Sequence, residues 1–211
     1  MLQIQTIEPN TLDLLKYIMQ CPFLHNFNLV GGTALALQIG HRLSYDLDMF
    51  GNNPLQHDDI IDYLQLKYKV TKINTSNKIL ILNVDNIKTD FVNYKYPLLD
   101  NIVEYDGIRM VSKKDIAAMK LNAIVGRGRK RDFVDLFFLL KEFTLDQLLQ
   151  FYNLKFEDGS VMMVLRSLNY FDDAENDSNI NFCKPSNWEK IKLKSDRVLG
   201  NYYGANGYGK E

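Results

Sequence analysis

The segment from Arg42 to Phe50, RLSYDLDMF, constrains the fold most strongly because its apolar and polar side chains alternate. One side carries Leu43, Tyr45, Leu47 and Met49, and the other carries Arg42, Ser44, Asp46 and Asp48. This period of two predicts a β-strand with one face against a core. It also sets Asp46 and Asp48 on the open face, with Cα atoms about 6.5–7 Å apart. Carboxylates held that close repel each other unless a cation lies between them, so the strand predicts a metal site.

A glycine turn precedes this strand and leads into a predicted helix. A short strand near residues 27–30 is followed by Gly31 and Gly32, and residues 33–38 have a helical pattern. Glycine permits a positive φ and leaves the backbone bare, and the amides at a helix N-terminus suit a phosphate. Because most Gly-Gly turns between a strand and a helix serve the fold alone, this motif needs support from the rest of the chain.

A third carboxylate lies in a later strand. Strand patterns cover residues 68–73, 79–84 and 87–94, and the last of them alternates again. Asp90 stands in the middle of this otherwise apolar strand. It is either a functional carboxylate or an Asp at an exposed strand edge, and Asp85 competes with it for the functional role.

The chain beyond residue 111 is predicted to be mainly helical. Lys120 and Arg127 are seven residues apart and project from one face of a helix. Asp132 and Asp135 lie one turn apart on the next helix, whose remaining circumference is largely apolar, so they lie near a polar cleft or form internal ion pairs. Residues 127–131 are the concentrated basic patch. Residues 171–179 are predicted to be a solvated loop, and the glycine-rich residues 200–211 to be irregular.

Composition and charge exclude several classes of protein. The chain has 211 residues, of which 46% are hydrophobic and 24% charged, with a formal net charge of -1. These values fit a globular protein and argue against a protein coated in basic residues for nucleic acid. Cys21 and Cys183 are too few for a disulfide framework or a zinc site. No signal-peptide pattern or membrane-spanning apolar run is present, so we expect a cytoplasmic protein without membrane contact.

Together these features are the parts of a metal-assisted nucleotidyl-transfer site. Two Mg²⁺ ions, or Mn²⁺ in their place, lie about 3.5–4 Å apart in such sites and stabilise the attacking and leaving oxygens of an in-line displacement. The carboxylates would hold the ions. Backbone amides and a Lys or Arg would neutralise the triphosphate of a bound NTP.

Two motifs resemble known families. The run Gly31-Gly32-Thr33, followed by Arg-x-Ser-x-Asp-x-Asp-x-Phe over residues 42–50, resembles the signature of DNA polymerase β-type nucleotidyltransferases. Lys120-x-x-Ala-x-x-x-Arg127 with Arg131-Asp132-x-x-Asp135-Leu narrows the resemblance to the AbiEii/AbiGii toxins, the toxin half of abortive-infection toxin–antitoxin pairs. The resemblance covers about residues 25–140. It implies an α/β (α+β) fold, with a polymerase β-like mixed sheet flanked by helices over 1–111 and a mainly helical domain over 112–211 that completes the active-site cleft.

The resemblance also implies roles for single residues in the first half of the chain. Asp46 and Asp48 would bind the metal ions, and Asp90 would be the third metal ligand and the base on the acceptor hydroxyl. Gly32 and Thr33 would hold the β- and γ-phosphates, with Gly31 permitting the turn.

Further roles fall on polar residues from both halves. Lys120 would contact the triphosphate, and Arg127 or Arg131 would do the same or hold the acceptor. Asp132 and Asp135 would orient Lys120. Ser44, with Arg42, either binds the nucleotide or pairs within its own turn.

The function expected from the resemblance is transfer of NMP from an NTP to an RNA, with tRNA a candidate, or to a protein. The enzyme would be the toxin of a type IV pair with a cognate antitoxin. Two alternatives stay open: a nucleotide-binding toxin module with little turnover, and a small-molecule adenylyltransferase of the antibiotic-modifying kind, which shares the first motif but not the second.

Overall fold

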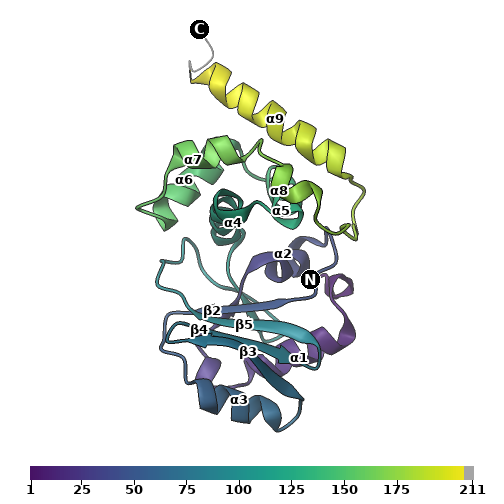
Figure 1. Ribbon diagram of the computed structural model, residues 1–211, viewed down its shortest axis with the longest axis vertical. Coiled ribbons are helices and arrows are strands. Elements are labelled where there is room, and N and C mark those ends of the chain that lie inside the picture. The colour runs from purple at the N-terminus through teal and green to yellow at the C-terminus, as the bar shows by residue number, and fades with distance from the viewer. Residues whose placement is uncertain (207–211) are drawn as a thin grey trace. The chain divides into compact units, whose positions relative to one another are not determined.

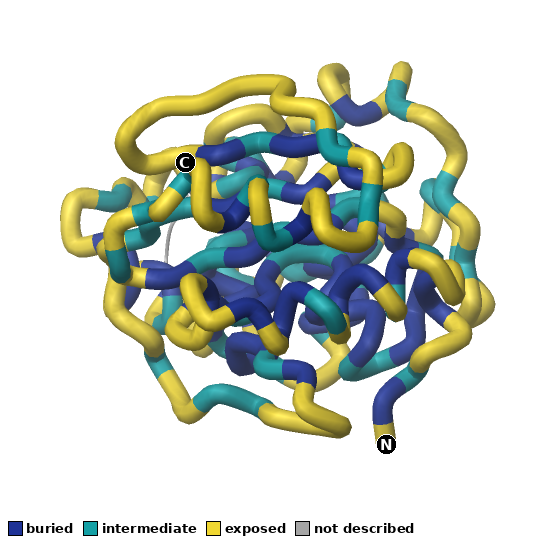
Figure 2. Tube along the Cα trace, turned by 90° about the horizontal axis from the view of Figure 1, so that it is seen from below, coloured by how far each residue is buried: buried dark blue, intermediate teal, exposed yellow. Residues whose placement is uncertain are grey.

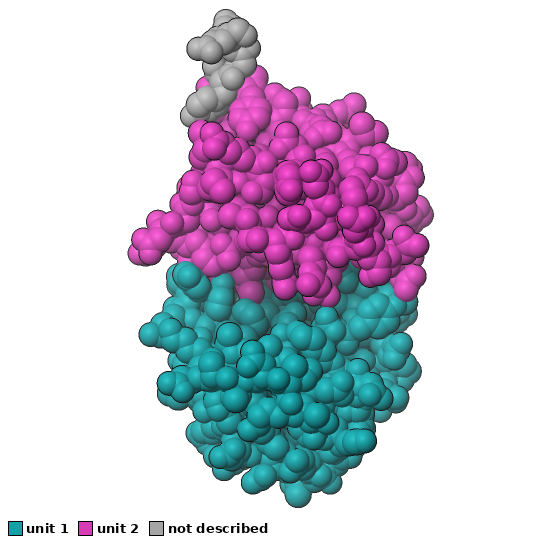
Figure 3. Space-filling view, viewed as in Figure 1, with its two compact units in different colours: residues 1–112 teal, residues 113–211 magenta. Residues whose placement is uncertain are grey.

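The chain divides into two compact units in the computed structural model, which describes residues 1–206. The units are Met1–Ser112 and Lys113–Glu211 (Figure 3). The described strands all belong to the first unit, and the second is built from helices. The assignment of 1–111 as a nucleotidyltransferase domain, and of 112–211 as the domain that completes a cleft, stays a prediction.

The first unit contains one mixed sheet. Its strands are β1 (Asn28–Leu29), β2 (Leu47–Gly51), β3 (Val70–Ser76), β4 (Ile79–Val84), β5 (Ile87–Asn93), β6 (Val103–Tyr105) and β7 (Ile108–Met110). Among the described residues they form a 7-stranded sheet in the order β3-β4-β5-β2-β1-β7-β6 (Figure 1). The pairs β2–β5 and β1–β7 are parallel, and the other neighbouring pairs are antiparallel. The mixed sheet with flanking helices confirms the predicted α/β fold class.

One face of this sheet is buried. Leu47 and Met49 of β2 lie opposite Thr89 and Phe91 of β5, and all four are 0% exposed. The helices of this unit are η1 (Ile4–Thr6), α1 (Pro9–Met19), η2 (Pro22–Leu24), α2 (Gly31–Ile39) and α3 (His57–Gln65). Apolar residues of α1 and α3 contribute to the core of this unit. Figure 2 colours the buried segments dark blue and the exposed ones yellow. In Figure 1, α2 lies on the opposite side of the sheet from α3.

The strand predicted for residues 42–50 begins only at Leu47, which corrects the first part of that prediction. Arg42 and Ser44 are buried at 4% and 6% exposure, whereas Tyr45, expected in the core, is 47% exposed. The reason is local pairing. The Ser44 N–H donates to the carbonyl oxygen of Thr6 at 2.9 Å, so this segment is fixed to η1 before it enters the sheet.

The edge strand β3 is irregular. Its register against β4 shifts between Lys72 and Asn74, so Ile73 forms a bulge. Residues 71–76 are all exposed. This strand therefore adds little to the core, and β4 carries the buried positions on that side of the sheet.

The second unit consists of α4 (Lys113–Arg127), α5 (Lys130–Leu139), α6 (Leu145–Lys155), α7 (Val161–Ser167), α8 (Asp172–Glu175) and α9 (Trp188–Ala205). A capping box between Thr144 and Gln147 begins α6. No helix of residues 1–206 is long and apolar enough to cross a membrane.

Two sequence predictions for this unit are wrong. Residues 171–179 include the short helix α8, whose Ala174 is 0% exposed. Residues 200–205, predicted to be irregular, continue α9, because Ile191, Ser195 and Leu199 recur every four residues on one buried side and carry the helix onward. The rest of the predicted irregular tail, residues 207–211, lies outside the described residues.

Candidate active site

Asp48 and Asp90 lie opposite each other on neighbouring parallel strands. Hydrogen-bonded strands are about 4.8 Å apart, and residues in register share a face, so the two side chains stand side by side on the open face of the sheet. Both residues are half-buried. The alternation of β2 and β5 explains the arrangement, because the residues on either side of each Asp point into the core. The structure thus brings together two of the three predicted metal ligands.

The glycine turn lies against this pair. Gly31 has a φ of 68°, and a Cβ atom built on it would lie 2.8 Å from Oδ2 of Asp48. The N–H of Val30 donates to the carbonyl oxygen of Asp48 at 2.9 Å, which fixes the beginning of α2 beside β2. The first amides of a helix have no intrahelical partner, so the amides of Gly31, Gly32 and Thr33 form an anion-binding terminus next to a carboxylate. Glycine is required here by both backbone angle and space.

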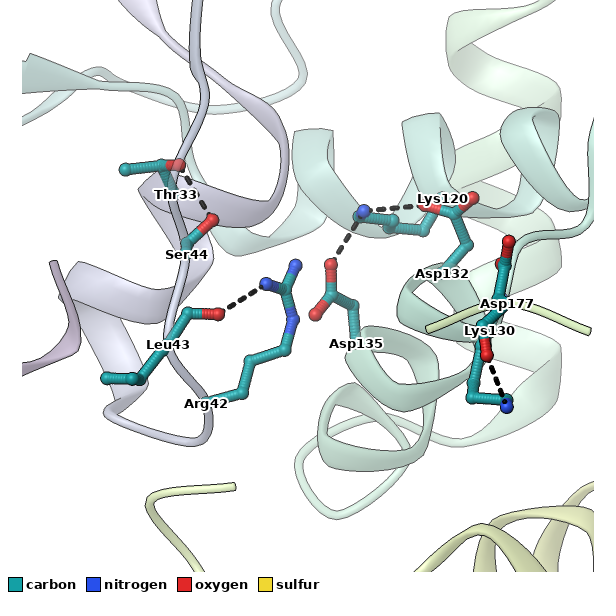
Figure 4. A network of polar contacts seen from close by, with 9 residues as sticks. All are labelled: Thr33, Arg42, Leu43, Ser44, Lys120, Lys130, Asp132, Asp135 and Asp177. Carbon is teal, nitrogen blue, oxygen red and sulfur yellow. Dashed lines mark hydrogen bonds and ion pairs between the residues drawn. The ribbon is translucent and has the colours of Figure 1, made fainter. Parts of the chain in front are cut away.

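Thr33 uses its side chain within the fold. Its hydroxyl is hydrogen-bonded to the Ser44 hydroxyl at 2.8 Å (Figure 4). The Thr33 hydroxyl also donates to the carbonyl oxygen of Asp46. Thr33 is 1% exposed. The pair therefore fixes the segment that leads from Ser44 through Asp46 into β2. The predicted phosphate contact of Thr33 would then be made by its backbone amide.

The surroundings of Asp90 distinguish it from Asp85. The Lys88 ammonium contacts Oδ2 of Asp90 at 2.5 Å, while Oδ1 of Asp90 is buried without a hydrogen-bond partner. Asp85 lies in the turn between β4 and β5 with a φ of 48°, and its Oδ1 accepts a hydrogen bond from the Lys69 N–H. Asp85 thus stabilises a turn, and the geometry favours Asp90 as the functional carboxylate.

The donor set of this face fits a hard divalent cation. Mg²⁺ prefers carboxylate oxygens and takes one or two of them, with water and substrate phosphates in its other positions. Asp48 and Asp90 supply that pair, and the buried Oδ1 of Asp90 is an oxygen that a cation would satisfy. Within residues 1–206, no three His, Cys, Asp or Glu side chains form a group that could hold a metal ion. Asp46, just before β2, therefore does not join the other two in a cluster of three.

In the second unit, Lys120 is buried between two carboxylates of α5. Its Nζ lies 2.7 Å from Oδ1 of Asp132 and 2.6 Å from Oδ2 of Asp135 (Figure 4). The side chains are 8%, 5% and 0% exposed, in that order. Oδ2 of Asp132 is buried without a hydrogen-bond partner. The second acidic pair thus orients Lys120, as an internal ion-pair network.

The basic patch of residues 127–131 is divided between surface and interior. Arg127 and Arg129 are exposed, and Arg131 is half-buried. Lys130 is 9% exposed, and its Nζ donates to the carbonyl oxygens of Glu175 and Asp177 at 3.2 and 3.0 Å.

Sequence reasoning missed the buried position of Lys130. Oδ2 of Asp177 accepts the Lys130 backbone N–H at 2.8 Å, and the ammonium lies 5.5 Å from the Trp188 ring centroid. The available signal was that Lys130 stands three residues before Phe133, on the apolar side of the helix.

A family model described as "Nucleotidyl transferase AbiEii toxin, Type IV TA system" matches residues 13–201. The chain belongs to the AbiEii family. It is therefore a nucleotidyltransferase of a toxin family, which confirms the recognition from the motifs. The match extends beyond the motifs into α9.

A relative and two solved structures agree with AbiEii membership. An uncharacterized protein of Aquifex aeolicus (strain VF5), aq_aa25, is 35% identical over 168 residues, which cover 77% of this chain and 82% of the relative. A candidate nucleotidyltransferase from H. pylori has a TM-score of 0.63 at 18% identity, covering 96% of each chain. MenT4, the nucleotidyltransferase toxin Rv2826c of Mycobacterium tuberculosis H37Rv, has a TM-score of 0.60 at 16% identity, covering 90% of this chain and 82% of MenT4. At these identities the two structures establish a shared fold with the AbiEii chain.

Proposed function

We propose that this AbiEii-family enzyme transfers the NMP of an NTP to a hydroxyl of an RNA or a protein, with a tRNA 3′ end as the first candidate. The reaction would require Mg²⁺ or Mn²⁺. The observation that carries this proposal is the register of Asp48 with Asp90 beside Gly31 at the beginning of α2. Paired carboxylates suit divalent ions, and a glycine-opened helix N-terminus suits a phosphate.

The residues on the sheet divide the chemistry between them. Asp48 and Asp90 would hold the divalent ions, which supply charge stabilisation to the transferring phosphoryl group. Asp46, two residues before Asp48 and outside this pair, stays the third predicted metal ligand. The amides of Gly32 and Thr33 would bind the β- and γ-phosphates. The Asp90 carboxylate would also accept the proton of the acceptor hydroxyl as the hydroxyl oxygen forms a bond to the α-phosphorus and the bond to pyrophosphate breaks. Ser44 would act through its hydrogen bond to Thr33.

Lys120 supplies a positive charge for the triphosphate in this proposal. Its ammonium would reorient from Asp132 and Asp135 toward the phosphates, with which it would form charge-assisted hydrogen bonds. Arg127 and Arg131 would contact either the triphosphate or the acceptor. A cost accompanies this arrangement, because moving Lys120 leaves two buried carboxylates with less compensation.

A transfer assay tests the proposal. The purified protein is incubated with each α-labelled NTP, Mg²⁺ and total RNA, and label in RNA is measured. We expect Asp48→Asn and Asp90→Asn each to lower transfer at least about 100-fold, since each removes several kcal/mol of charge stabilisation. Asp106→Asn is the matched control, because Asp106 is an exposed residue of the β6–β7 turn with a φ of 49°.

The outcomes of this assay separate the alternatives. Label in RNA that survives protease and disappears with ribonuclease supports an RNA acceptor, and the reverse supports a protein acceptor. Nucleotide binding without label in any acceptor would favour a binding module. Unchanged transfer in both Asp variants would show that the site lies elsewhere.

The biological setting we propose is that of a type IV toxin with a cognate antitoxin in the cytoplasm. Family membership supports it. Expression of the wild-type chain should arrest growth, and Asp48→Asn should relieve the arrest at equal protein level. Arrest by both proteins would separate toxicity from nucleotidyl transfer.

A further inference from the structure

A row of aromatic rings lies next to the carboxylate pair. Phe50 is two residues beyond Asp48 on β2, and alternation puts it on the same open face. The Tyr94 N–H donates to the carbonyl oxygen of Gly51 at 2.6 Å, which continues the pairing of β5 past Asn93. Tyr94 thus falls on the face of Asp90. The ring centroids of Phe50 and Tyr94 are 4.9 Å apart, and those of Tyr94 and Tyr96 are 5.0 Å apart.

These rings form a surface and not a core. Tyr96 is 50% exposed, and Phe50 and Tyr94 are half-buried. The exposed Lys95 stands between the two tyrosines in sequence. The core side chains of these strands, by contrast, point to the other face and are 0% exposed, as for Met49. The aromatic row is therefore a partly exposed surface on the face that carries the carboxylate pair.

The glycine turn and the aromatic row lie on opposite sides of Asp48 along the sheet. β1 runs antiparallel to β2, with Asn28 opposite Phe50 and Leu29 opposite Met49. Along β1 the chain therefore passes Phe50 first, at Asn28. It lies beside Asp48 at Val30 and then enters the glycine turn, which leads away from Phe50. β2 and β5 are adjacent (Figure 1), so Tyr94 lies on the Phe50 side.

In an in-line displacement the attacking and leaving oxygens lie on opposite sides of the phosphorus. With pyrophosphate leaving at the glycine turn, the acceptor enters from the side of Phe50 and Tyr94. We propose that Phe50, Tyr94 and Tyr96 form a stacking platform for the unpaired bases at the end of an RNA acceptor. This inference rests on the proposed function and selects RNA over protein as the acceptor.

The chemistry of the row fits single-stranded RNA. Each base has a π-face, so unpaired bases can stack on exposed aromatic rings without requiring one sequence. A protein acceptor would present one hydroxyl side chain and would have no use for three adjacent rings.

The test is the affinity of the full chain for a short single-stranded RNA that ends in CCA, labelled with fluorescein at its 5′ end, measured by anisotropy without NTP. Tyr94→Leu and Tyr96→Leu keep apolar volume and remove the phenol ring. We expect each to raise the Kd for RNA about 5- to 150-fold, the range for loss of base–aromatic stacking. The affinity for ATP with Mg²⁺ should be unchanged.

Tyr105→Leu is the matched control, because Tyr105 is 49% exposed on β6, an edge strand of the same sheet away from β2 and β5. It should leave the Kd for RNA unchanged. The Kd of Phe50→Leu for RNA is measured as well, and a thermal melt verifies that this variant folds. Tyr96→Leu should have little effect on the core, because Tyr96 is exposed.

Three results would overturn the inference: an unchanged Kd for RNA in both tyrosine variants, an equal loss in Tyr105→Leu, or a loss of ATP affinity in place of RNA affinity. A loss of ATP affinity would show that the aromatic row binds the base of the NTP. Because RNA affinity is measured without NTP, failure of the platform is distinct from failure of nucleotidyl transfer, which would appear as absent ATP binding and absent label transfer.

Discussion

Gly31 is the residue whose identity the candidate site tolerates least. Its backbone occupies the left-handed region, and the carboxylate of Asp48 fills the space where a side chain would begin. Sequence analysis identified the glycine from its neighbours in the motif and noted that glycine permits a positive φ, which Gly31 adopts. It could not show that Asp48 is the group in contact, because that contact depends on the register of β1 against β2.

Gly31→Ala should therefore impair both stability and activity. The strained φ costs about 1–3 kcal/mol, and the added Cβ would displace Oδ2 of Asp48, so label transfer should fall together with the free energy of unfolding. Gly126→Ala is the control, since Gly126 lies in α4 with no atom within 4 Å of a built Cβ. That control should be neutral or stabilising by about 1 kcal/mol. Equal behaviour of the two variants would contradict this account of Gly31.

The two cysteines should differ sharply in reactivity. Cys21 is 1% exposed, and burial raises the pKa of its thiol, whereas Cys183 is exposed. Because the thiolate is the reactive form, a thiol reagent at mildly alkaline pH should modify Cys183 rapidly and Cys21 only after unfolding. Cys183→Ser should remove the fast phase. Two thiols modified at the same rate in the folded protein would count against this difference.

At the scale of elements, α4 holds the second unit together through buried charges. Lys120 pairs with α5, and Asp115 pairs with Lys155 of α6 at 2.7 Å, with side chains 0% and 1% exposed. Helices joined in this way keep a fixed register, because neither charge can be left alone in the interior.

Asp115→Ala should accordingly lower the free energy of unfolding by about 3–5 kcal/mol, since it leaves the Lys155 ammonium buried without its carboxylate. Glu189→Gln is the comparison, because it breaks an i,i+3 pair with Lys192 in which Glu189 is 73% exposed. That change should cost less than about 1 kcal/mol. Denaturant unfolding measures both, and similar costs for the two would show that burial does not strengthen the inner pair.

The contact between α8 and α9 should give an acid-sensitive contribution to stability. Hydrogen bonds from Lys192 and Trp188 hold the pKa of Glu175 below its ordinary value of 4.5. Such a carboxylate stabilises the fold above its unfolded pKa and loses that contribution as pH falls through the lower folded value. The Tm difference between wild type and Glu175→Gln should thus be present at neutral pH and shrink below about pH 4.5. A difference independent of pH would exclude this linkage.

Element types were predictable where periodicity was strong. β4 spans the predicted residues 79–84, and β5 ends one residue short of the prediction. Residues 42–46 were mistaken for strand because alternation alone does not reveal that Ser44 pairs with Thr6. Residues 200–205 were not predicted as part of α9 because their glycines disfavour a helix. The buried side of α9 continues to Leu199 and supports the helix there.

At the scale of the whole molecule, the motifs identified the family, since they lie in short local runs. The pairing of Asp48 with Asp90 was harder to predict, because 42 positions of chain separate the two residues and only the parallel register of β2 and β5 joins them. The aromatic row also depends on the register of β2 and β5, and it was not predicted from the sequence.

Nucleotide binding should be visible in the thermal stability of the full chain. A ligand at about 100 times its Kd stabilises the folded state by about 2.7 kcal/mol, so ATP with Mg²⁺ should raise the Tm by several degrees. Chelation of the metal by EDTA should remove most of this shift, and Asp48→Asn with Asp90→Asn should not show it. A shift of equal size with EDTA would contradict a metal-dependent nucleotide site.

The bulge at Ile73 has a consequence for how copies of this protein meet. An edge strand with regular, unpaired amides and carbonyls is a template on which a second molecule can extend the sheet, and bulges and lysines disrupt that template. β3 carries both, the bulge at Ile73 and the exposed Lys72. Continuous sheets running from one molecule into the next through this edge are therefore disfavoured, so the chain can accumulate in a crowded cell with less risk of edge-to-edge aggregation.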